Sequence, residues 1–160
     1  MKKLNFLGFM MAFGLMLAGC GGKNVATTPV QAVGDYGVRV EKFASQMQNT
    51  VAGSPLSDDV KARAMVGFRN VGVQIERLGI TLSAYDAAMK LNQPVDGTDA
   101  AALAEQIKSG LLAVITIVRG GDTSVANQLT TTYSLVEQLL TELRTKLKIG
   151  GGNAAFAGGN

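Results

Sequence analysis

Cys20 is the only cysteine in the 160-residue chain. A cysteine thiolate can act as a nucleophile or a metal ligand, and two cysteines can form a disulfide. A single cysteine closes no disulfide within the chain, and a zinc site needs further sulfur or imidazole ligands, whereas this sequence has no histidine. The role of Cys20 therefore has to be read from the residues around it.

The segment before the cysteine is basic at its start, apolar in its middle and rich in small residues at its end. Lys2 and Lys3 come first, and residues 4–18 then carry no charge. A basic region, an apolar run and a small-residue cleavage zone are typical of a secretory signal peptide. A membrane-spanning helix needs about 20 apolar residues, more than this run provides. We therefore expect residues 1–19 to be a cleaved signal peptide and not a transmembrane helix.

The four residues Leu17-Ala18-Gly19-Cys20 resemble the lipobox of bacterial lipoprotein precursors. The resemblance covers only the start of the chain. It implies that the sulfur of Cys20 carries a diacylglycerol, that cleavage falls between Gly19 and Cys20, and that the new amino terminus is acylated as well. Each buried CH₂ contributes about 0.8 kcal/mol to membrane affinity, and two or more acyl chains anchor a protein stably. The alternative is that Cys20 is an incidental free thiol.

The residue after the cysteine bears on the membrane involved. Gly21 stands there instead of aspartate. In Gram-negative members of the lipoprotein family, this implies sorting to the periplasmic face of the outer membrane. The expected location is therefore the cell envelope, with lipidated Cys20 as the contact to the membrane.

The charge balance changes once the expected signal peptide is removed. The full chain has 15 basic and 12 acidic residues, and two of the basic ones are Lys2 and Lys3. The mature chain would therefore carry 13 basic residues, which is 15 minus 2, against the same 12 acidic ones. Nucleic-acid binding needs a clustered excess of positive charge. We therefore expect no nucleic-acid partner.

The mature chain lacks the side chains that most enzymes use. Without histidine the common general base at neutral pH is missing, and an acylated Cys20 is no longer a nucleophile. No serine is followed three residues later by lysine, the pattern of penicillin-recognising enzymes. A catalytic pair of carboxylates remains an alternative, because glycosidases carry out catalysis with carboxylic side chains alone. The acids lie mostly at expected helix starts and on polar sides of the helices, so we predict a protein that is not an enzyme and has no cofactor or metal.

The composition divides the mature chain into three parts. Residues 20–28 begin with the lipidated cysteine, show no periodicity and are expected to be a flexible tether. Residues 150–160 are rich in glycine and are expected to be a disordered tail. Residues 29–149 form the predicted domain, which is long enough to bury a substantial core.

Apolar residues in this domain recur every three or four positions in four separate segments. That spacing lines up side chains on one side of an α-helix. The four sets are Tyr36, Val40, Phe43, Met47 and Val51; Val60, Ala64, Phe68, Val71, Ile75, Leu78, Leu82, Tyr85 and Met89; Leu103, Ile107, Leu111, Val114 and Val118; and Val125, Leu129, Thr132, Val136, Leu139, Leu143 and Leu147. Four amphipathic helices with short connections predict an all-α fold, an antiparallel up-down-up-down four-helix bundle.

Polar residues at the expected starts indicate where helices begin. Ser57 precedes two aspartates and suits the N-cap of the second helix. Thr98 could cap the third helix, and Asp122, Thr123 or Ser124 could cap the fourth. Residues 111–118, LLAVITIV, are apolar and β-branched, so a strand is a local alternative. We favour a helix because the spacing continues from Leu103 and no partner strand is visible.

The second helix carries a further apolar row with a spacing of seven: Val66, Val73 and Ile80. We expect this row to be buried too, so that the helix sits centrally in the bundle. The glycines of this helix are expected to permit close packing or a bend. They are Gly67, Gly72 and Gly79. The arginines of the same helix, expected to form a solvated rim, are Arg63, Arg69 and Arg77.

Three functions fit these observations. The first is a non-enzymatic, membrane-anchored envelope lipoprotein whose bundle binds another envelope protein as a scaffold or assembly module. The second is a carrier of an apolar or lipid ligand in the bundle interior. The third is an envelope protein of a phage or mobile element that excludes infection or aids lysis. A homo-oligomer stays open as well, because an amphipathic helix can complete the core of a second copy.

Overall fold

The computed structural model describes residues 28–147. Cys20 and its expected cleavage site therefore lie outside the described residues. So do the expected signal peptide (1–19), most of the expected tether (20–28) and the glycine-rich tail (150–160).

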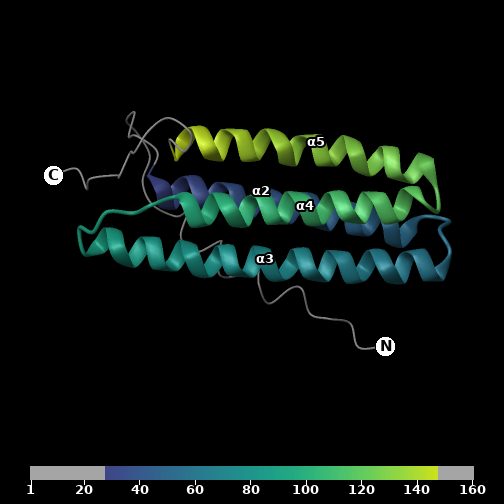
Figure 1. Ribbon diagram of the computed structural model, residues 1–160, viewed down its shortest axis with the longest axis horizontal. Helices are drawn as coiled ribbons and strands as arrows, with labels where there is room; N and C mark the ends of the chain where they lie inside the picture. The colour runs from purple at the N-terminus through teal and green to yellow at the C-terminus, as the bar shows by residue number, and fades with distance from the viewer. Residues whose placement is uncertain (1–27, 148–160) are drawn as a thin grey trace.

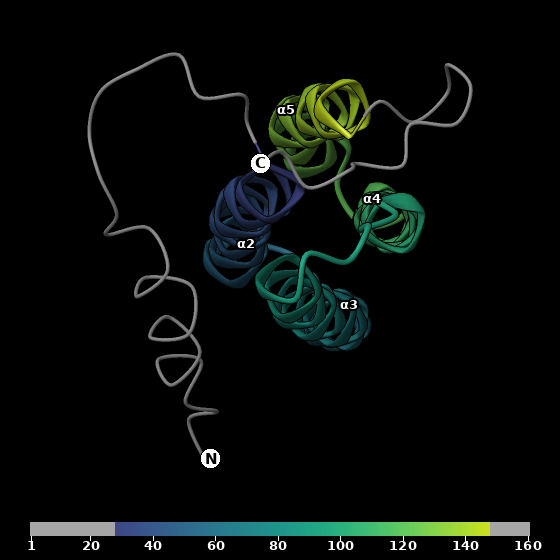
Figure 2. The same cartoon turned by 90° about the vertical axis from the view of Figure 1, so that its left-hand side faces the viewer.

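Residues 28–147 form four α-helices and no strand: α2 (Pro29–Gly53), α3 (Asp58–Lys90), α4 (Thr98–Arg119) and α5 (Thr123–Lys146). Short connections reverse the chain after each helix (Figure 1). Viewed along the bundle, the helices occupy four corners, so that α2 contacts α3 and α5, and α4 also contacts α3 and α5 (Figure 2). The predicted all-α, antiparallel four-helix bundle is confirmed, and the apolar run 111–118 is part of a helix.

Side-chain caps determine where three of the helices begin. The Thr28 hydroxyl accepts from the backbone N–H of Gln31, whose carboxamide oxygen accepts from the N–H of Thr28, which completes a capping box for α2. Ser57 caps α3, as predicted, and the Asp122 carboxylate caps α5 by accepting from two backbone N–H groups. The expected cap of α4 was wrong, because Gly97 occupies the N-cap position and Thr98 is the first helical residue.

The connection between α3 and α4 is held by side-chain contacts to its backbone. The Tyr85 hydroxyl donates to the carbonyl of Asp96 and accepts from the N–H of Ala100. The Asp96 carboxylate accepts from the N–H and hydroxyl of Thr98, and these bonds hold the pKa of Asp96 below its usual range. Asn92 has φ of 54°, a left-handed conformation that asparagine tolerates better than most residues. Hydrogen bonds from Tyr85 and Asp96 to the backbone of this turn therefore take the place of the side-chain cap that was expected from Thr98.

The predicted apolar sides of the helices form the core. Nearly all of their members are buried, and the fully buried centre includes Val40, Met47, Ile107, Leu111 and Leu129. Tyr133 is buried where the spacing pointed to Thr132, which is only half-buried. Met89 is 36% exposed because it lies in the last turn of α3, at the end of the bundle.

The expected burial of the second row on α3 was wrong. Val66, Val73 and Ile80 are 55%, 42% and 66% exposed. A spacing of seven is nearly two helical turns, so the row stays on one side of the helix, and that side is opposite the buried residues. Within the described bundle, α3 packs against α2 and α4 and lies diagonally from α5, so its position is a corner and not the centre (Figure 2).

Two glycines set the close approach of α3 to α4. A β-carbon added at Gly67 would lie 2.6 Å from Cγ2 of Val114, and one added at Gly110 would lie 2.8 Å from Cγ2 of Val71. Real β-carbons do not come this close to another atom, so the two helices can approach to this distance only because both positions are glycine. The close-packing role expected for Gly67 is confirmed. A β-carbon at Gly72 would meet no atom within 4 Å, so Gly72 has no such role.

Candidate functional site

The site residues predicted from the sequence, Cys20 for the lipid and Gly19 with Cys20 for signal cleavage, lie outside the described residues, so the lipid anchor and the cleavage stay predictions. Among residues 28–147, no group of three or more Cys, His, Asp or Glu side chains is arranged to hold a metal ion. Asp58 and Asp59 lie in the first turn of α3 and Asp122 caps α5. These acids occupy helix starts, where they stabilise the helix dipole.

The tyrosines of the core have a structural role. Tyr36 is 2% exposed, and its hydroxyl donates to the carbonyl of Ala104 on α4. Burial, followed by the nearby Glu105 carboxylate, raises the pKa of Tyr36 well above its usual range. Burial likewise raises the pKa values of Tyr85 and Tyr133. These hydroxyls hold their protons at neutral pH, so they act as hydrogen-bond donors and not as bases.

The first surface feature is the outer row of α3, which consists of Val66, Val73 and Ile80. All three point away from the core and are the exposed apolar residues of the middle of α3. Arg69 and Arg77, one turn on either side of Val73, are exposed as well. The row is therefore an apolar stripe along the middle of α3 with arginines beside it.

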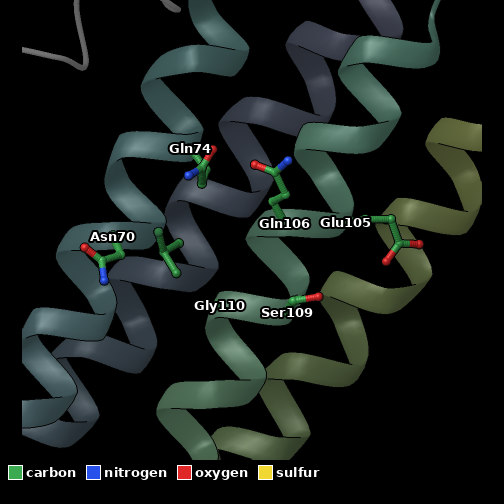
Figure 3. Close-up of a pocket in the computed structure, with 7 residues that line it drawn as sticks. Asn70, Gln74, Glu105, Gln106, Ser109 and Gly110 are labelled. Atoms are coloured by element: carbon green, nitrogen blue, oxygen red, sulfur yellow. The ribbon is translucent and has the colours of Figure 1, made fainter.

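The second feature is a groove between α3 and α4, with a volume of about 340 Å³. This α3–α4 groove is lined by Asn70, Val71, Gln74, Glu105, Gln106, Ser109 and Gly110. Figure 3 shows the carboxamides of Gln74 and Gln106 extending toward each other across the groove, while Glu105 points away toward α5. Small-molecule sites commonly have volumes of about 300–1,000 Å³, so the groove is large enough for a small ligand.

The α3–α4 groove is lined by no unpaired charge among the described residues. Its one ionisable residue, Glu105, is paired with Arg144 of α5 at 2.7 Å and with Lys108 at 3.0 Å. The remaining polar groups are three carboxamides and the Ser109 hydroxyl. The carboxamide oxygen of Gln74 is buried and accepts no hydrogen bond from the described residues. A buried acceptor without a donor costs about 1–3 kcal/mol, so this oxygen is suited to a donor brought by a ligand.

Neither surface feature was identified from the sequence. The spacing of Val66, Val73 and Ile80 was noticed, but it was assigned to the core. Gln74 and Gln106 lie on different helices, 32 positions apart, and only the packing of α3 on α4 brings them together. Gly110 was one available signal, because a glycine in the interior of a helix often marks a close approach.

One described helix, α4, is long and apolar enough by length and composition to cross a membrane. In the bundle, its apolar residues lie against the other three helices, and eight of its residues are buried. A core helix of a globular bundle has the same composition, so this property of α4 does not indicate a membrane span.

Comparison of the chain with protein-family models, with curated protein sequences and with solved structures gives no match. The features of the chain that bear on its function are therefore the outer row of α3, the α3–α4 groove and the sequence around Cys20.

Proposed function

We propose that the protein is a non-enzymatic lipoprotein of a bacterial cell envelope and that its bundle binds another envelope protein. In this proposal, the lipid on Cys20 anchors the chain to the membrane. The observation that carries the proposal is the outer row of α3, three exposed aliphatic side chains on a bundle whose core is already complete. Covering such a row removes apolar surface from water, which favours association.

The outer row favours an amphipathic helix as the partner. Apolar residues spaced by seven recur every two turns, the spacing at which two helices pack along each other. Arg69 and Arg77 flank Val73, and Glu76 is the one acid between them. This excess of positive charge favours a partner helix with carboxylates along its edges. A second copy of α3, antiparallel and centred on Val73, would bring Arg69 against Arg77 of the other copy, and like charges oppose that pairing.

The carrier hypothesis ranks below this proposal. Val40, Met47 and Ile107 in the centre of the core are 0% exposed. A ligand carried between the helices would have to displace such side chains, and well-packed cores resist that change in volume. A protein partner on the outer row needs no rearrangement of the core.

The test is crosslinking of the full-length protein in its native cells, followed by mass spectrometry of membrane extracts. The docking variant is Val73→Ser combined with Ile80→Ser, and the matched control is Leu112→Ser combined with Leu135→Ser, which removes exposed apolar side chains from α4 and α5. We expect a specific protein partner with the native chain and the control, and its loss with the docking variant. Cys20→Ala is expected to release the protein from the membrane fraction.

Two outcomes would count against the proposal separately. Equal recovery of every crosslinked protein with the docking variant and the control would contradict docking on α3. A Cys20→Ala protein that stays fully in the membrane fraction and carries no acyl chain would contradict the lipid anchor.

A further inference from the structure

The α3–α4 groove offers a specific set of hydrogen-bonding groups. Gln74 and Gln106 face each other from the two helices, and Asn70 and Ser109 lie beside them (Figure 3). Each carboxamide supplies both an N–H₂ donor and an oxygen acceptor. The set contains no free charge, so it is not suited to an inorganic anion or cation.

The carboxamide oxygen of Gln74, which accepts no hydrogen bond from the described residues, indicates that the ligand must contribute a hydrogen-bond donor. This oxygen is buried, whereas the Gln74 side chain as a whole is partly exposed. A turn of the carboxamide brings the oxygen to the groove, where a ligand gains by donating an N–H or O–H to it. Gln106 on the other side is exposed, and its carboxamide oxygen faces Gln74 in Figure 3. A half-turn about the last side-chain bond, a torsion with two nearly equivalent positions, presents the amide N–H₂ of Gln106 to a ligand carbonyl instead. The ligand therefore needs a donor and an acceptor a short distance apart, which a secondary amide has on one planar group.

The apolar part of the groove fits the remainder of such a ligand. Val71 and Gly110 lie among the lining residues, and a β-carbon added at Gly110 would lie 2.8 Å from Cγ2 of Val71. An acetyl methyl group or a small side chain next to the amide can rest on this surface. The lining residues include no aromatic ring to stack on a ligand, so we expect millimolar affinity for a single small molecule.

We propose that the α3–α4 groove binds an uncharged secondary amide, which donates its N–H to the Gln74 oxygen and accepts from the Gln106 amide group. Two sources have this chemistry: the acetamido group of an amino sugar and the backbone of a peptide. The inference is independent of the partner proposed for the outer row, because the groove residues are not members of that row.

The test is an NMR titration of the full-length protein in detergent micelles, with ¹⁵N-labelled glutamine side chains. The probes are N-acetylglucosamine, N-acetylalanine methylamide and, as the control without an amide, glucose. We expect the side-chain resonances of Gln74 and Gln106 to shift saturably with an amide probe and not with glucose. A response to the sugar alone identifies a saccharide, a response to the peptide alone a protein segment, and a response to both the amide group itself.

Variants make the assignment specific. Gln74→Leu is expected to weaken binding at least tenfold, and Gln106→Ala about tenfold, the factor that corresponds to about 1.4 kcal/mol. Gln128→Ala, an exposed glutamine on α5, is the matched control and is expected to bind like the native chain. The proposal is overturned if neither amide probe shifts the two resonances, if glucose shifts them equally, or if binding to Gln74→Leu is unchanged while its spectrum stays that of a folded bundle.

Discussion

The α3–α4 interface and the α2–α5 interface join antiparallel helices of the same bundle by different means. α3 and α4 approach through Gly67 and Gly110, and the groove at their surface has a volume of about 340 Å³. α2 and α5 are joined at their surface by an ion pair between Arg39 and Glu142 at 3.0 Å. The hollow beside that pair has a volume of only about 10 Å³, close to the space of one water molecule.

The α3–α4 interface is therefore controlled by steric packing, whereas the surface contact between α2 and α5 is electrostatic. The glycines of α3 and α4 approach Val114 and Val71, which are buried in a packed core, where one methyl group more or less changes the free energy of unfolding. The Arg39–Glu142 pair is about half exposed on both sides, at 52% and 49%, so water and salt weaken it. We therefore expect the α3–α4 interface to respond to side-chain volume and the α2–α5 ion pair to respond weakly, mainly to salt.

The largest expected effect is the difference between Gly67→Ala and Gly72→Ala. Both changes give α3 a better helix former, so the gain in helix propensity, up to about 1 kcal/mol, is shared. Only Gly67→Ala pushes a methyl group against the fully buried Val114. We expect its free energy of unfolding to be about 1–3 kcal/mol below that of Gly72→Ala, measured by urea denaturation. Equal stability of the two variants would contradict glycine-dependent packing.

Tyr36→Phe tests a contact that joins the two interfaces, because Tyr36 of α2 donates to the carbonyl of Ala104 on α4. At neutral pH we expect a loss of about 0.5–1.5 kcal/mol for the missing hydrogen bond. The folded-state pKa of Tyr36 is raised above its unfolded value of 10.0, so its stabilising contribution is complete below pH 10 and decreases as the pH rises above it.

The free energy of unfolding should therefore fall less steeply with pH in Tyr36→Phe than in the native chain. Unfolding curves between neutral and strongly alkaline pH measure the two slopes. Tyr133→Phe is the comparison variant and should change the slope less, because Tyr133 is less buried than Tyr36 although its pKa is raised as well. Parallel slopes for Tyr36→Phe and the native chain would mean that the hydroxyl of Tyr36 reaches water.

Gln74→Leu is expected to stabilise the protein by about 1 kcal/mol, since it replaces an unpartnered buried acceptor by an apolar group of similar size. Gln106→Leu, on the other side of the α3–α4 groove, is exposed and should change stability little. Thermal unfolding of the two variants without ligand measures this difference. A loss of stability in Gln74→Leu would show that the carboxamide oxygen has a partner, such as a bound water.

The smallest expected effect belongs to the α2–α5 interface. Arg39→Ala should cost about 0.2–1 kcal/mol at low salt, because it removes a half-exposed ion pair. The loss should shrink in high salt, which screens the pair. Urea denaturation at two salt concentrations measures the change, with Glu142→Ala as the matched partner. A loss that is large and independent of salt would mean that the pair is buried and that the two interfaces are not different in kind.

Much of the bundle could be predicted from the sequence because it depends on neighbours along the chain. The N-caps at Ser57 and Asp122 act on backbone groups two or three residues away. The apolar spacing of three and four reports one helix at a time, and it identified nearly all of the core. The error at Thr98 arose because other groups serve the start of α4: Asp96 accepts from the N–H of Thr98 itself, and the Tyr85 hydroxyl accepts from the N–H of Ala100, which a Thr98 cap would have served.

The surface features could not be predicted in the same way. The row formed by Val66, Val73 and Ile80 has the residue types of a core, and only the positions of the neighbouring helices show that nothing covers it. The α3–α4 groove requires Gln74 and Gln106 to meet from helices whose relative register is set by Gly67 and Gly110. Periodicity within one helix contains no information on that register.

By itself, the sequence determined the helices, the starts of α3 and α5 and the side of each helix that enters the core, because capping and hydrophobic periodicity act over a few residues. The lipid anchor expected at Cys20 likewise depends on adjacent residues alone. Only the tertiary structure decided which apolar side chains stay exposed and which polar ones meet across two helices. The physical reason is that burial and hydrogen-bond partnering depend on contacts between segments distant in the chain, and those contacts exist only once the bundle has formed.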